Sequence, residues 1–182
     1  MPEYSHNEIS DLIEGKLPWS ILKPIMSSPK DNDRFDKYVE VLQEKVPWTE
    51  KILLPISEHL FIVQKGKDRI VKCDCGNEFG DYRENWKLKA LIEVLDSEEK
   101  LEDIYNGTGK PDPHLCQIRQ YYCPACGTQL EVESVTVGEP IIFEFLPDID
   151  TFYREWLGRP LEDEKEFKDL SYEVTRRWGE EK

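Results

Sequence analysis

Hydrophobic positions near the start of the chain recur every three or four residues, which is the period of an amphipathic α-helix. Ile9, Leu12 and Ile13 follow this spacing and predict a first helix, and a short second one begins at Pro18. A third helix, ending before Pro47, is predicted by four residues at the same spacing: Phe35, Tyr38, Val39 and Leu42. Residues 1–50 are therefore expected to form a helical N-terminal arm.

From about residue 51 the pattern changes to short runs rich in β-branched and aromatic residues. Such runs predict strands. They are HLFIVQK (59–65), RIVKCDC (69–75), ALIEVL (90–95), CQIRQYYC (116–123) and TQLEVESV (128–135). The segment QKGKDRI supplies a turn between the first two, and residues 96–105 can form a short helix before a loop that contains glycine and proline. Residues 51–146 are expected to form an antiparallel β module with this helical insert.

The helical period returns in the last part of the chain. In LPDIDTFYREWLGRP, Asp148 or Asp150 can cap a helix, and aromatic residues share one face. Beyond Pro160 an acidic segment carries an apolar stripe at helical spacing: Phe167, Leu170, Val174 and Trp178. We therefore expect C-terminal helices over residues 147–182 and an α+β fold, with a small zinc-ribbon-like antiparallel core between two helical parts.

Charge and hydropathy exclude several classes of partner. The 182 residues include 24 basic and 38 acidic ones, so the formal charge is −14. This charge repels nucleic acids and anionic membrane surfaces at long range. Since no apolar run approaches the roughly 18 residues of a membrane span, and the N-terminus lacks the pattern of a signal peptide, a cytoplasmic protein is expected. Cytoplasmic thiols stay reduced, which favours metal binding over disulfides for closely spaced cysteines.

Two closely spaced cysteine pairs are the strongest indication of a chemical site, a metal site, in the sequence. CDCG supplies Cys73 and Cys75, and CPACG supplies Cys123 and Cys126. Each pair is followed by a glycine that lets the backbone turn sharply, so that two sulfurs can face one point. Zinc prefers four such ligands in a tetrahedron, and iron accepts the same set. The sequence predicts one structural metal site made of these four cysteines.

The cysteines also allow interpretations other than a metal site. Cys123 and Cys126 could form a thioredoxin-like redox pair, but GTQLEVESV predicts a turn and a strand where such a pair needs a helix. Cys116 is interpreted as a small apolar residue on a strand, and His6 and His59 as ordinary residues.

The chain has no phosphate-binding, dinucleotide-binding or Gly-x-Ser-x-Gly motif, and no residue is expected to be catalytic.

The chain resembles the gamma subunit of acetone carboxylase and related ketone carboxylases. The resemblance extends from about residue 7 to Pro160 and rests on several blocks in order: residues 27–65, VKCDCGNEFGDYRENWKLKA, QYYCPACGTQLEVE and PDIDTFYREWLG. It implies a small, non-catalytic subunit of a cytoplasmic ATP-dependent enzyme that converts acetone and bicarbonate to acetoacetate. Two larger subunits of alpha and beta type would carry ATP and a second divalent metal, while the small subunit holds zinc through Cys73, Cys75, Cys123 and Cys126.

Three alternatives remain open at this point. The chain could be the corresponding subunit of an acetophenone carboxylase, a free-standing zinc-ribbon adaptor that binds other proteins, or a dithiol oxidoreductase. The five tryptophans and the apolar stripes on polar helices suit a protein that contacts larger partners. The N-terminal helices and the C-terminal segment are the expected places of contact.

Overall fold

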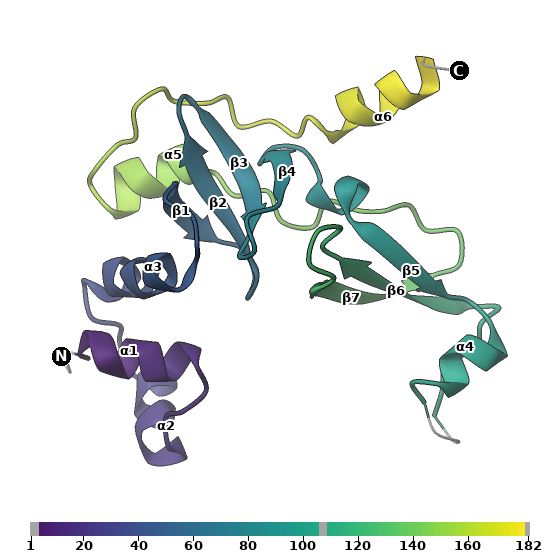
Figure 1. Ribbon diagram of the computed structural model, residues 1–182, viewed down its shortest axis with the longest axis horizontal. Coiled ribbons are helices and arrows are strands. Elements are labelled where there is room, and N and C mark those ends of the chain that lie inside the picture. Colours follow the sequence, from purple (N-terminus) through teal and green to yellow (C-terminus); the bar gives the residue numbers. More distant parts are fainter. Residues whose placement is uncertain (1–3, 106–108, 181–182) are drawn as a thin grey trace.

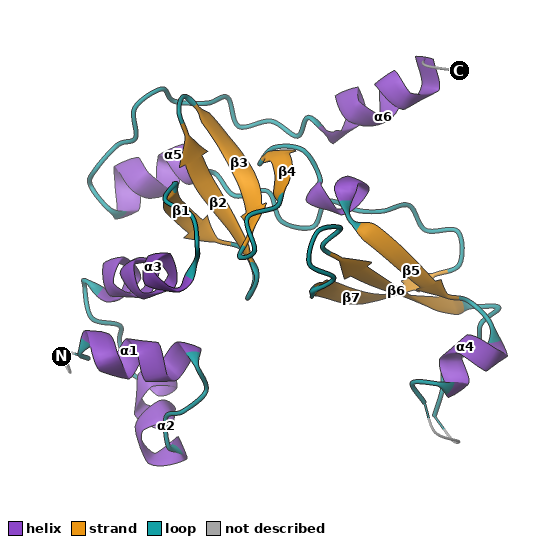
Figure 2. Ribbon diagram, viewed as in Figure 1, coloured by secondary structure: helices purple, strands orange, loops and turns teal. Residues whose placement is uncertain are grey.

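A computed structural model of the chain describes residues 4–105 and 109–180. The described residues form two antiparallel sheets, with helices at both ends of the chain (Figures 1 and 2). The first sheet has the order β1-β2-β3-β4: Lys51–Pro55, Leu60–Lys65, Asp68–Cys73 and Glu78–Asp81. The second has the order β5-β6-β7: Leu91–Leu95, Cys116–Tyr122 and Gln129–Thr136. The predicted α+β, zinc-ribbon-like fold class is thereby confirmed.

The helices lie outside these sheets. Three precede the first sheet: α1 His6–Ile13, α2 Trp19–Ser27 and α3 Arg34–Lys45. The 3₁₀ turn η1 (Trp86–Lys89) joins the sheets, and α4 (Glu98–Glu102) follows β5. Near the C-terminus are α5 Ile149–Thr151, the π-helical turn η2 Phe152–Trp156 and α6 Ser171–Glu180. None of the helices in the described part of the chain has the length and apolar character needed to cross a membrane.

The first sheet is covered on both faces, which explains its nearly continuous apolar runs. On one face Ile52, Phe61 and Val63 pack against residues of α3, among them Leu42. On the other face lies the larger core, which continues into the second sheet and η2. Its buried members are Leu53, Leu60, Ile62, Val71, Cys73, Phe79, Tyr82, Trp86, Tyr121, Cys123, Leu130, Ile149 and Tyr153. The two sheets therefore share one core.

The sequence pattern identified β2, β3, β5, β6 and β7 but missed two strands of the first sheet. In β1 a bulge between Ile52 and Leu54 interrupts the alternation of side chains. In β4, which has four residues, only Phe79 is buried. Neither strand is a run rich in β-branched and aromatic residues, the signal from which the other strands were predicted. Of the predicted loop after α4, residues 106–108 lie outside the described residues.

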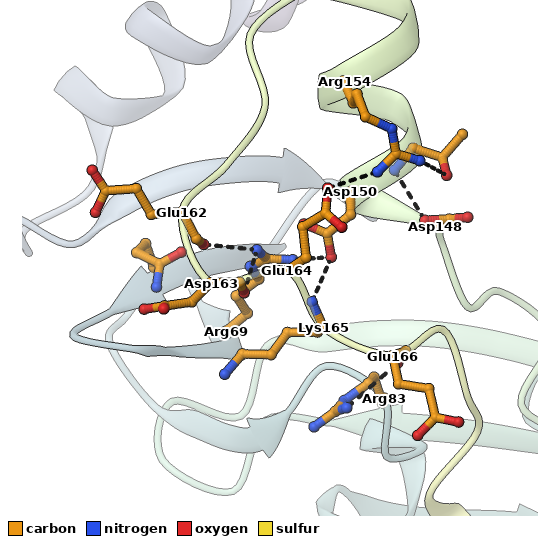
Figure 3. Close-up of polar contacts among 12 residues, drawn as sticks. Arg69, Arg83, Asp148, Asp150, Arg154, Glu162, Asp163, Glu164, Lys165 and Glu166 are labelled. Atoms are coloured by element: carbon orange, nitrogen blue, oxygen red, sulfur yellow. Dashed lines mark hydrogen bonds and ion pairs between the residues drawn. The ribbon is translucent and has the colours of Figure 1, made fainter.

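Residues 161–170, which we call the strap, are irregular where the apolar spacing suggested helix; the helix α6 begins only at Ser171. Arg69 on β3 and Arg83, just after β4, bind the strap's backbone (Figure 3). Arg69 Nη2 donates to the carbonyl oxygens of Glu162 and Asp163 over 3.3 and 3.2 Å. The amide of Leu170 donates to the carbonyl oxygen of Arg83 over 2.8 Å. These three backbone groups are therefore satisfied without helical hydrogen bonds.

The strap is fixed by a buried ion pair between Arg69 on β3 and Asp150 on α5. Arg69 Nη1 lies 2.6 Å from Asp150 Oδ2, and the two side chains are 1% and 8% exposed. The same oxygen accepts the amide hydrogen of Lys165 on the strap, at 3.0 Å. Burial alone would raise the pKa of Asp150, but its hydrogen bonds from Arg69 and Lys165, with attraction to Arg69 and Arg154, lower it. Asp148 is the residue that caps α5, by accepting the amide of Thr151.

Candidate metal centre

Each cysteine pair sits in a tight turn at the end of a strand. Cys73 is the last residue of β3, and Cys123 directly follows β6. In both turns the glycine amide donates to the carbonyl oxygen of the first cysteine over 2.9 Å, from Gly76 to Cys73 and from Gly127 to Cys123. Gly76 has a φ of 102° and Gly127 a φ of 73°, in the region that favours glycine. The predicted turns are thus formed, one from each sheet.

The two turns bring the four sulfur atoms together. Cys73 Sγ lies 3.9 Å from Cys126 Sγ, and Cys75 Sγ lies 3.7 Å from Cys123 Sγ. All four sulfurs lie within 4.8 Å of one another. A tetrahedron with metal–sulfur bonds of ~2.3 Å has edges of ~3.8 Å, so the distances of 3.9 and 3.7 Å match the edge of a tetrathiolate site. The set fits zinc or iron, and it fills the four positions of a tetrahedral ion.

The electrostatics of the cluster also fit a cation. Cys73 and Cys123 are buried, while Cys75 and Cys126 are exposed. Burial raises the pKa of the thiols of Cys73 and Cys75. In contrast, hydrogen bonds from the side chain and the amide of Thr128 lower the pKa of Cys126 to about 6. The lowered pKa prepares the sulfur of Cys126 to bind as a thiolate, whereas a bound cation would favour loss of the protons from Cys73 and Cys75.

Two residues that border the first turn were not recognised from the sequence. The indole of Trp48 donates from Nε1 to the carbonyl oxygens of Cys73 and Asp74, at 3.2 and 3.0 Å. His59, expected to be an ordinary residue, has Nδ1 2.6 Å from Asp74 Oδ2, and its carbonyl accepts the amide of Asp74. The hairpin between β2 and β3 pairs Leu60 with Cys73. A prediction of this register from the sequence would have identified His59 as the neighbour of Asp74.

The remaining candidates lie away from the four sulfurs. Cys116 is on β6, where its Sγ lies 2.9 Å from Ser134 Oγ, and it does not belong to the cluster. His6 is in the N-terminal arm, where its Nε2 lies 3.5 Å from Glu44 Oε1. The turn of Cys123 and Cys126 leads into strand β7, as the sequence predicted. It therefore lacks the following helix whose N-terminus activates the thiol of a thioredoxin-like pair.

A second group of possible metal ligands consists of Glu131, Glu133 and Glu144, which no sequence motif singles out. The ammonium group of Lys87 already lies among them, with Nζ at 2.6, 2.8 and 3.1 Å from their carboxylate oxygens. The Lys87 side chain is 2% exposed. This group is thus an ion-pair network around a buried lysine, which supplies the cation.

Comparison with known proteins gives consistent matches. The model of the family described as acetone carboxylase gamma subunit matches residues 46–157. The chain is 46% identical over 160 residues to the acetone carboxylase gamma subunit of Xanthobacter autotrophicus, a match that covers 87% of this chain and 95% of that protein. It is 31% identical over 84 residues to the acetophenone carboxylase beta subunit of Aromatoleum aromaticum, covering 43% of this chain and 62% of that one.

Proposed function

This chain belongs to the acetone carboxylase gamma subunit family, and from that premise we propose that it is the small zinc-holding subunit of an ATP-dependent ketone carboxylase. The complex would convert acetone and bicarbonate to acetoacetate. Similarity to the Xanthobacter gamma subunit over 95% of that protein's length is the observation that carries this proposal. Acetone is favoured over acetophenone because the acetophenone carboxylase relative is matched over a shorter and less similar stretch.

The role proposed for this chain is structural. A catalytic zinc keeps one position open for water or substrate, whereas four thiolates would fill the coordination sphere. Cys73 and Cys75 come from the first sheet, and Cys123 and Cys126 from the second. A bound zinc would supply the cross-link between the two sheets. Nucleotide binding, the second divalent metal and the carboxylation itself would belong to the two larger subunits.

Co-purification tests the proposal directly. We expect a tagged copy of this chain, expressed in its own host grown on acetone, to retain two much larger chains, because the small subunit functions only within the complex. The retained material should form acetoacetate from acetone, bicarbonate and ATP, and should act more slowly on acetophenone. Recovery of the chain alone would favour the free-standing adaptor, and preference for acetophenone would assign the complex to the sister group.

A further inference from the structure

Helix α2 carries a wider band of apolar residues than it buries, and most of its residues are exposed. Trp19 is 65% exposed, Met26 is 64% exposed and Ile21 also faces solvent, whereas Ile25 is the buried residue of this helix. The apolar face of an amphipathic helix normally packs against protein. In Figure 1, α2 lies beyond α1, at the end of the molecule away from the second sheet. The isolated chain thus leaves most of this helix uncovered.

The local sequence does not stabilise α2 well. The helix has nine residues, and helices this short are marginal without packing. Pro24 lies inside it and removes a backbone donor, and the N-cap residue Pro18 makes no side-chain hydrogen bond to it. Ile25 contributes its contacts to a small cluster with Tyr4, Ile9 and Val41. A second surface that packs against Trp19 and Met26 would supply the stabilisation that α2 lacks.

The charge of the segment indicates the character of that surface. Residues 16–30 contain three lysines and no acidic residue, in a chain that has 38 acidic residues. Lys16 pairs with Glu14, and Lys30 donates to the carbonyl oxygen of Ile25. Lys23 is exposed and has no carboxylate within ion-pair distance among the described residues. The α2 segment is therefore a basic, apolar region on an acidic protein, and a complementary partner surface is apolar with acidic residues at its rim.

We propose that residues 16–30, centred on α2, are the docking element by which this chain inserts into an acidic-rimmed apolar groove on one of the larger carboxylase subunits. The assignment rests on the proposed function, since that function supplies the partner. Two copies of this chain would each carry a charge of −14, and an anionic membrane would also repel it. A larger subunit is thus the favoured occupant, with self-association and membrane binding as the competing outcomes.

The direct test is the double substitution Trp19→Gln with Met26→Gln in the full chain, mixed with the two larger subunits. We expect the affinity for the larger subunits to fall about 30-fold or more, as for buried aromatic anchors at interfaces. Zinc content and thermal unfolding of the free chain should not change, because both side chains are exposed. The matched control is Leu115→Gln, at a residue of similar exposure, 68%, beside the second sheet; it should leave the affinity unchanged.

A charge substitution provides an independent measurement should the double variant misfold. Lys23→Glu should slow association with the larger subunits at low salt, whereas Lys67→Glu, in the exposed turn between β2 and β3, should not. Amide hydrogen exchange of residues 16–30 should also slow in the complex relative to the free chain. Equal association rates for the two charge variants, or unchanged exchange in an assembled complex, would overturn the docking assignment.

The remaining outcomes are also decisive. If the wild-type chain fails to bind the larger subunits, the proposed function itself is wrong. If it binds them but the double variant binds equally well, only the docking assignment is wrong. Light scattering and sedimentation with phosphatidylserine–phosphatidylcholine vesicles identify the other occupants. Loss of a dimer or of vesicle binding in the double variant, with assembly intact, would assign α2 to one of them and overturn the proposal.

Discussion

Replacing Cys123 by serine should abolish metal binding and leave the region of the two sheets unfolded. Apparent binding free energies of structural zinc are about 10–16 kcal/mol, as large as the whole stability of a typical domain, about 5–15 kcal/mol. Cys123 is buried in the core that both sheets share, so its replacement by serine also disturbs the packing of that core. Zinc content by elemental analysis and unfolding followed by circular dichroism measure the two effects.

Cys116→Ser is the matched control for this substitution. Cys116 lies on β6 outside the sulfur cluster, and it is neither fully buried nor fully exposed. The variant should keep its zinc and unfold close to the wild type. A Cys123→Ser protein that stays folded and metal-free, but loses a dithiol oxidoreductase activity, would contradict the structural site and support the redox interpretation.

Asp150→Asn should lower the free energy of unfolding by about 3 kcal/mol, because it leaves the buried charge of Arg69 without its counter-ion. The Arg69 side chain is 1% exposed and cannot turn into solvent. The substitution also weakens the acceptor of the Lys165 amide, so the strap should separate from β3. Urea unfolding at neutral pH measures the loss of stability, and hydrogen exchange over residues 161–170 measures release of the strap.

The pH dependence of this effect has a definite sign. The pKa of Asp150 is lowered in the folded protein, so its ion pair contributes fully above the unfolded value of about 3.9 and is lost as the pH falls toward the folded pKa. The stability difference between wild type and Asp150→Asn should therefore be constant near neutral pH and shrink below about pH 4.

Glu164→Gln provides the control for the ion pair. Glu164 lies 2.7 Å from Arg154 in an exposed pair of the same region, shown in Figure 3. Exposed pairs contribute little because solvent screens them. The same carboxylate-to-amide change should therefore cost far less stability here than at Asp150. Equal losses for the two variants would show that the Arg69 pair does not hold the strap.

The grouping of the four cysteines could be predicted from sequence because its determinants are local. Each turn contains its cysteines and its glycine within a few residues, and a strand leads into each. The N-terminal helices were predicted for the same reason: the apolar period of α1 and α3 is read within one segment. The grouping of the sulfurs could be expected without knowing the structure of the chain between the two turns, because one ion bound by both turns brings them together.

The buried charges could not be predicted because their partners are distant along the chain. Arg69 pairs with Asp150, 81 residues away, and Lys87 lies among carboxylates of β7 and the following loop. Nothing near these residues distinguishes them from surface charges. The helix predicted for the strap was wrong for a related reason: its apolar spacing suggests a helix, but Arg69 of the first sheet binds two of its carbonyl groups.

X-ray absorption at the zinc edge of the purified complex tests most directly whether sulfurs from both sheets hold one ion. Combined with elemental analysis, it should show one zinc per copy of this chain, surrounded by four sulfur atoms at ~2.3 Å. Iron bound by the same four sulfurs would change the identity of the metal but not the assignment of its ligands. A chain without bound metal, or an ion surrounded mainly by nitrogen or oxygen, would contradict the assignment of Cys73, Cys75, Cys123 and Cys126 as its ligands.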